Sequence, residues 1–199
     1  ASDRYGSESI IASGASGVAA GDGAGLRGKK ICFPFGTNAH AYILGALNEA
    51  GLTPDDVELI NVAPGDVLTA LAEGSIDAFV LWEPNPTIAL DQVEGSVRVQ
   101  RAVESSPGYF PGIVITSEQL AHDKAAEIQA YMASIAEAQQ WIRANPEAAA
   151  ETATRWIPNM SKEVALEAFN SLILDSRVSK LALGALESNT MQRLIDLDL

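Results

Sequence analysis

Short apolar segments alternate with amphipathic segments through the first half of the chain. Strands are expected at residues 31–34, 57–62, 76–81 and 97–100, where apolar residues run together or alternate with polar ones. Helices are expected between them at residues 39–50, 67–72 and 87–92, where apolar residues recur with helical spacing. Strands that alternate with helices through short connections predict a parallel sheet covered by helices. The fold class indicated by the pattern is therefore α/β.

The second half of the chain is expected to be almost entirely helical. Helices are predicted at residues 120–144, 146–156, 161–174 and 181–198. Ser117 is expected to cap the first of these, and Asn145 followed by Pro146 to start the second. Tyr131 and Trp141, together with Trp156, are expected to pack within this helical part. Two short apolar segments, 9–12 and 112–116, are predicted to be strands that flank the α/β lobe.

The composition excludes several classes of function but says little more about the fold. The net charge is −13, from 26 acidic and 13 basic residues, which repels phosphates and argues against a nucleic-acid partner. No apolar run reaches the ~20 residues that a membrane-spanning helix needs. The single cysteine, Cys32, lies inside an apolar strand and is expected to be buried and inert. Neither a catalytic set nor a metal-ligand spacing is visible, so no cofactor and no enzyme activity are expected.

The loop that follows the first strand of this pattern is the main candidate for a binding site. Ligands of an open α/β sheet lie outside the carboxyl ends of its strands. Gly36 to Ala39 would place a helix N-terminus there, whose free N–H groups suit a sulfonate, carboxylate or nitrate. The hydroxyl of Thr37 and the amide of Asn38 would add polar contacts, and His40 follows closely. The alternatives are that Thr37 or Asn38 is a simple helix cap and that His40 is a packed residue.

The next two loops supply the remaining candidates at the same edge. Trp82 could stack on a flat ligand, and Glu83 could accept a hydrogen bond from a ligand amine. The alternatives are hinge packing for Trp82 and a role at the start of the following helix for Glu83. Pro64 lies in a loop that reaches the same edge, and its neighbour Asp66 is more simply a helix-start residue.

Basic residues are scarce near this expected site. Lys29 and Lys30 precede the strand and so lie at its other end, and the loops at the carboxyl edge carry no Arg or Lys. This distribution favours a weakly charged, zwitterionic or neutral ligand. Tyr109 and Phe110 precede the segment 112–116 and are expected either at a hinge or in the core.

Several segments together resemble the type II periplasmic solute-binding proteins of ABC importers. The similar branch takes nitrate, taurine and aliphatic sulfonates and includes relatives that bind thiamine-pyrimidine precursors. The matching segments are LRGKK (26–30), GTNAH (36–40), LNEAGL (47–52), VELINV (57–62), Pro64, Ala70–Leu71, Gly74, Asp77, WEP (82–84), Pro111–Gly112 and WIRANPEAA (141–149).

The resemblance implies two α/β lobes joined by hinge strands, with the ligand in the cleft between them. It divides the chain into a hinge strand region (1–13), a complete second lobe with a parallel sheet (14–106), and a returning strand with a helical segment of the first lobe (107–199). Most of the first lobe is expected to be missing, so self-association through the exposed surface is expected.

The function that the resemblance implies is a periplasmic or extracellular receptor, with or without a lipid anchor. It would bind a small ligand such as a sulfonate, nitrate, taurine-like compound or pyrimidine and deliver it to the permease subunits of an ABC importer. The alternatives are the effector-binding domain of a transcription regulator and, with less support, an enzyme similar to the pyrimidine synthases.

Overall fold

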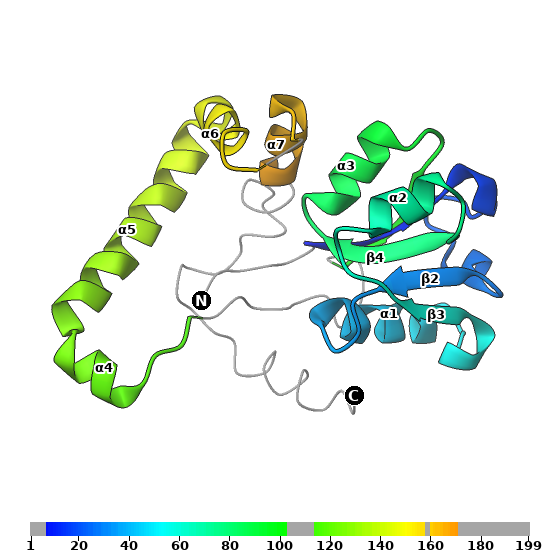
Figure 1. The fold of residues 1–199 in the computed structure, drawn as a ribbon, viewed down its shortest axis with the longest axis horizontal. Coiled ribbons are helices and arrows are strands. Elements are labelled where there is room, and N and C mark those ends of the chain that lie inside the picture. Colours follow the sequence, from blue (N-terminus) through cyan, green and yellow to red (C-terminus); the bar gives the residue numbers. More distant parts are fainter. Residues whose placement is uncertain (1–6, 103–113, 158–159, 171–199) are drawn as a thin grey trace.

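The computed structural model describes residues 7–102, 114–157 and 160–170 (Figure 1). The strands are β1 (Glu8–Ala12), β2 (Lys30–Phe33), β3 (Glu58–Asn61), β4 (Ala78–Trp82) and β5 (Val97–Arg101). The helices are α1 (Asn38–Glu49), α2 (Val67–Ala72), α3 (Asn85–Gln92), α4 (Glu118–Asp123), α5 (Ala125–Ala144), α6 (Pro146–Ala153) and α7 (Lys162–Phe169). Short 3₁₀ turns lie at Gly14–Ser16, Gly23–Leu26 and Pro54–Asp56.

The five strands form one mixed sheet in the order β3-β2-β4-β1-β5. Strand β2 pairs in parallel with β3 and β4, as the alternation of strands and helices predicted. Strand β1 is antiparallel to both β4 and β5 and lies between them. The prediction of a parallel sheet, with the segment 9–12 beside the lobe, is therefore wrong for this strand. A hinge role for β1 stays a prediction.

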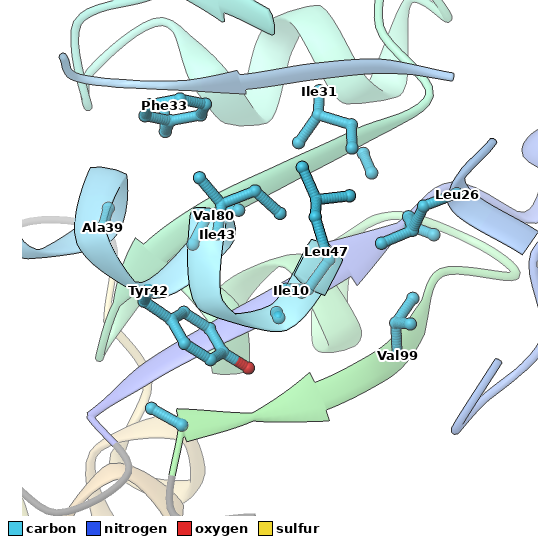
Figure 2. Close-up of a cluster of buried hydrophobic side chains, with 14 of the residues drawn as sticks. Ile10, Leu26, Ile31, Phe33, Ala39, Tyr42, Ile43, Leu47, Val80 and Val99 are labelled. Atoms are coloured by element: carbon cyan, nitrogen blue, oxygen red, sulfur yellow. The ribbon is translucent and has the colours of Figure 1, made fainter. Parts of the chain in front are cut away.

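Alternation along the strands explains how the sheet is buried on both faces. One face packs against α1, whose inward side chains include Tyr42, Ile43 and Leu47 (Figure 2). Ile10 from β1 and Val80 from β4 meet that helix on the same side of the sheet. Successive side chains of a strand point to opposite faces, so a doubly covered strand is apolar at every position.

The opposite face of the sheet is covered by α2 and α3 (Figure 1). Ile11, Cys32 and Phe79, each one residue away from a side chain of the α1 face, pack there against Leu71 of α2 and Ala89 of α3. The burial expected for Cys32 is confirmed, because its exposed fraction is 0%. The two helical layers fix the sheet so that the carboxyl ends of β2, β3 and β4 lie at one edge.

The second half of the chain differs from its predicted form at three places. The expected helix 120–144 is two helices, because the backbone leaves the helical conformation at Lys124 (φ −124°, ψ 33°). Residues 114–116 form no strand, while residues 112 and 113 lie outside the described part. Tyr131, Trp141 and Trp156 are 51%, 46% and 81% exposed, so the expectation that they pack is wrong for the described residues.

In the described residues, α6 and α7 of this helical half contact the α/β part. Helix α7 packs on α3 and on α6, and Ile88, Ala150 and Val164 belong to one buried cluster there. Helix α5 extends away from the sheet (Figure 1). Tyr109, Phe110, the end of the helix 161–174 and the helix 181–198 lie outside the described residues.

Candidate functional site

Three connections meet at the carboxyl edge of the parallel strands. They follow β2, β3 and β4. Together with the last residue of β4 and the first turn of α1, they carry all eight residues that the sequence proposed: Gly36, Thr37, Asn38, Ala39, His40, Pro64, Trp82 and Glu83. The amino end of β1 lies at the same edge, because Glu8 pairs with Trp82. The structure therefore gathers every candidate at one edge of the sheet.

The N-terminus of α1 is not capped by a side chain within the described residues. Thr37 holds the N-cap position with an extended backbone, but its hydroxyl donates to the carbonyl oxygen of Pro34 at 2.7 Å. The Asn38 amide donates to the buried carboxylate of Glu8. The helix-cap alternative for these two side chains is therefore not what the structure shows. The His40 N–H donates to the Thr37 carbonyl oxygen at 3.0 Å, so the N–H groups of Asn38 and Ala39 are the ones that an acceptor from outside the helix could use.

The loop between β2 and α1 is held by three hydrogen bonds, two within the segment 34–40 and one to β3. Besides the Thr37 bond, the Phe35 N–H donates to Asn61 Oδ1 at 3.0 Å, and the Gly36 N–H donates to His40 Nδ1 at 3.3 Å. Gly36 has φ 74°, a left-handed conformation that glycine adopts without a steric penalty. The loop therefore approaches the helix in one defined geometry, which favours a preformed site.

Three aromatic rings run from the core to this loop. The centroid of Phe33, which is fully buried, lies 5.1 Å from that of His40 and 4.9 Å from that of Phe35. Phe35 and His40 are stacked, with centroids 5.2 Å apart and an interplanar angle of 27°. Phe35 is 45% exposed, and the sequence analysis missed it. The sequence did contain a signal for this residue: Phe35 is a large apolar residue that lies between a proline and a glycine, beyond the end of the strand.

In the described residues, the Glu83 carboxylate contacts groups of the protein itself. Its side chain is 0% exposed; one oxygen accepts from the Thr87 N–H at 3.2 Å, and the other lies 3.4 Å from Arg98 Nη2. The contact to Thr87 is the helix-start role given as the alternative for this residue. Trp82 is half-buried and packs against the hydrophobic clusters on both faces of the sheet.

A cation reaches this edge from a strand rather than from a loop. Arg98 of β5 contacts Glu83 and donates from Nη1 to Ser9 Oγ at 3.2 Å. The sequence analysis counted basic residues in the loops and so missed Arg98. Strand β5 comes close to Glu83 because it pairs with β1, and the place of β1 in the sheet was not predicted. Its charge is balanced by Glu83, so it does not by itself make the edge positive.

The remaining candidates are at the rim. Pro64 is half-buried and Asp66 is exposed; Asp66 holds the N-cap position of α2 without a capping bond from its side chain. Lys30 starts β2, and Lys29 Nζ donates to the Ser16 carbonyl oxygen at 2.7 Å, so both lysines lie at the opposite end of the strand, as expected.

The described residues hold no cluster of metal ligands, and their cysteine is not an activated nucleophile. No three His, Cys, Asp or Glu side chains of residues 7–102, 114–157 and 160–170 come together as metal ligands. Burial raises the pKa of the Cys32 thiol to about 12, so the thiol is protonated at neutral pH and is a poor nucleophile. In the same ranges, no helix has the length and hydropathy to cross a bilayer.

A separate pocket of about 460 Å³ lies beside the C-terminal half of α1. Asp22, Glu49 and Gln100 supply polar groups to it, and Ile10 and Val99 are among its apolar lining. None of the eight candidate residues lines it. It therefore does not belong to the carboxyl edge.

Comparison with curated proteins finds relatives that are binding proteins. An inferred binding protein from Brucella abortus (strain 2308) is 30% identical over 154 residues, covering 77% of this chain and 48% of the relative. An inferred aliphatic sulfonates-binding protein from Escherichia coli (strain K12) is 31% identical over 126 residues, covering 62% of this chain and 38% of the relative. The chain spans about half the length of the curated relatives it matches.

Solved structures show that the fold is shared by binding proteins and an enzyme. The periplasmic aliphatic sulphonate binding protein of Escherichia coli superposes with a TM-score of 0.73 at 21% identity, covering 98% of this chain and 59% of that one. The desulfurization enzyme DSZB superposes with a TM-score of 0.70 at 14% identity, covering 98% and 70%. At these identities the likeness shows the fold alone.

The family is shown by the sequence itself. The model of the NMT1-like family matches residues 5–157, which include the whole sheet and the loop between β2 and α1. The resemblance to solute-binding proteins read from the sequence is thus confirmed at the level of the family. This chain belongs to the NMT1-like family and has an α/β fold, with a mixed five-stranded sheet, that matches part of a periplasmic binding protein.

Proposed function

We propose that this chain is the ligand-binding part of a solute receptor for an ABC importer and that it binds a small organic anion at the carboxyl edge of its sheet. The sheet with α1, α2 and α3 would be the second lobe of a type II binding protein, and the helices from α4 onward would belong to the first lobe. Closure of two lobes around the ligand would present the complex to the permease subunits in the membrane.

The observation that carries this proposal is the uncapped N-terminus of α1. The helix is 12 residues long, and its first turn faces the edge at which ligands of open α/β sheets are bound. A helix N-terminus carries about half a positive charge, which stabilises an anion without a basic side chain. Thr37 and Asn38 keep their side chains in bonds to Pro34 and Glu8, so neither competes for the first N–H groups.

The relatives support an oxyanion ligand with an organic part. One relative is named for aliphatic sulfonates, and another from Escherichia coli is named as a taurine-binding periplasmic protein. A sulfonate has three oxygens that accept from N–H groups. Neither name mentions nitrate, so nitrate binding stays a prediction. Because the taurine-binding relative is named as periplasmic, the proposed location is the periplasm or the outer face of the membrane.

Catalysis is the less supported alternative, even though an enzyme shares the fold. The described residues contain no metal cluster, and Cys32, the single cysteine of the chain, is buried and protonated at neutral pH. A regulator's effector domain is the other alternative, and no contact in the described residues favours it. Self-association through the surface that the first lobe would cover stays a prediction that light scattering can test.

Two substitutions at one position test the proposal. Asn38→Pro removes one N–H from the first turn of α1; proline suits the first helical position, and the extended backbone of Thr37 (ψ 175°) tolerates it. Asn38→Ala removes the amide side chain but keeps that N–H, so it is the matched control. Calorimetry with methanesulfonate, taurine and sulfate would be performed on the protein expressed from its complete reading frame.

We expect the wild-type protein to bind a sulfonate and Asn38→Pro to bind it about tenfold or more weakly than Asn38→Ala. A hydrogen bond to a charged group contributes about 1.5–3 kcal/mol, which corresponds to at least that factor. Equal affinities of the two variants would contradict an anion held at the α1 N-terminus, and the absence of sulfonate binding by the wild-type protein would contradict the function.

A further inference from the structure

We propose that Phe35 determines ligand specificity at this site. Its ring, stacked on His40, would form an aromatic wall that packs against the apolar part of an organic anion whose charged group lies at the N-terminus of α1. This inference rests on the proposed function and adds the residue that would recognise the alkyl or aryl part of the organic anion and so disfavour a bare inorganic oxyanion.

The position of Phe35 is the first argument. It precedes Gly36 in the loop that leads into α1, so its side chain emerges within three residues of the helix N-terminus at Asn38. Single exposed apolar residues are common on protein surfaces and need no explanation by themselves. Phe35 differs because it lies at the edge that gathers all the other candidates and because its place is fixed by specific contacts.

The contacts that hold Phe35 are the second argument. Its backbone N–H is bonded to Asn61, its ring is stacked on His40, and Phe33 supports the pair from the core. His40 is itself oriented, since Nδ1 accepts from the Gly36 N–H. An aromatic side chain with few free torsions, held on several sides, loses little entropy when a ligand covers it.

The surface that remains exposed is the third argument. Phe35 keeps 45% of its surface exposed although its ring stacks on His40 and lies close to Phe33, so apolar area remains that a ligand could cover. The face of an aromatic ring carries partial negative charge, which disfavours a bare anion, whereas its area favours apolar contact. An inorganic oxyanion could use the α1 N-terminus but gain nothing from this wall, while an alkyl chain would cover it.

The test compares anions that share one head group. Methanesulfonate, hexanesulfonate and sulfate would be titrated by calorimetry into the wild-type protein and into Phe35→Ala and Phe35→Leu, each from the complete reading frame. Leu90→Ala is the matched control, because Leu90 is an exposed apolar residue (37%) on α3 and outside the proposed site. We expect the wild-type protein to bind hexanesulfonate at least tenfold more tightly than methanesulfonate or sulfate.

In Phe35→Ala the preference for hexanesulfonate should fall by about tenfold, as expected from the apolar area that loses its contact. Methanesulfonate affinity should change by less than about twofold, because the α1 N-terminus is untouched. Phe35→Leu should restore part of the preference, and Leu90→Ala should behave like the wild-type protein. This pattern would mean that Phe35 contacts the ligand and does not merely stabilise the loop.

Four results would overturn the inference, and they show whether the proposed function fails with it. Equal loss of methanesulfonate and hexanesulfonate affinity in Phe35→Ala would mean that the ring only supports the loop. Sulfate bound as tightly as hexanesulfonate, or a hexanesulfonate affinity unchanged in Phe35→Ala, would remove the wall while leaving a solute receptor in place. Failure of the wild-type protein to bind any of the three anions would remove the proposed function and this inference with it.

Discussion

Arg98→Met is expected to destabilise the protein strongly, because it leaves a buried carboxylate without its cation. The Glu83 side chain is 0% exposed and that of Arg98 is 18% exposed, so water cannot replace the lost charge. In the described residues the carboxylate would keep only the bond from the Thr87 N–H. The substitution keeps most of the length of the arginine stem, so loss of packing contributes little.

The size of the effect follows from the burial and the geometry. Removing one partner of a buried ion pair costs about 3–5 kcal/mol. The contact of 3.4 Å is long, so the lower end of that range, about 3 kcal/mol, is expected. For a chain of 150–250 residues, 1 kcal/mol shifts the unfolding midpoint by about 2–4 °C, which gives a decrease of about 6–12 °C.

Urea unfolding followed by circular dichroism would measure this loss, with two further variants. Glu83→Gln combined with Arg98→Met removes the unpaired charge, so the double variant should be more stable than Arg98→Met alone. Arg27→Met is the control, because the pair of Arg27 with Asp56 is largely exposed and should contribute little to stability. A loss below about 1 kcal/mol in Arg98→Met, or a double variant that is no more stable than Arg98→Met, would refute the reasoning.

Three further predictions concern the ionisation of Cys32 and Asp56. The Cys32 thiol should not react with a thiol reagent at pH 8 in the folded protein and should react fully in guanidinium chloride, because burial raises its pKa to about 12; reaction at equal rates in both states would contradict its burial. Stability should also fall above about pH 8.5, the ordinary pKa of a thiol, because the unfolded chain then ionises while the folded thiol stays protonated. The pKa of Asp56 is lowered, first by hydrogen bonds from the Thr53 backbone and side chain and then by Arg27, so it contributes stability that is lost as pH falls below about 4 through the folded pKa. Asp56→Asn should therefore make stability less dependent on pH between about 2 and 4, as measured by urea titrations at several pH values; an unchanged dependence would contradict this assignment.

Part of the site could be predicted because it depends on consecutive residues. Gly36 and the helix after it are local features, and they place a helix N-terminus at the end of a strand regardless of what packs nearby. The same local reasoning identified Thr37 and Asn38, although it could not say where their side chains would bond. Asn38 donates to Glu8, which is 30 residues away, and no local pattern contains that pairing.

The hydrophobic pattern of the sequence determined the α/β class, the elements from β2 to β5 and the burial of Cys32. Period-2 and helical spacings depend only on neighbouring residues, so they can be read along the chain.

Tertiary structure decided the rest. It placed β1 antiparallel between β4 and β5, brought Arg98 to Glu83 across 15 residues of sequence, and stacked Phe35 on His40. The order and direction of strands follow from burying both faces of the whole sheet, and that requirement is a property of the packed molecule, not of any one segment.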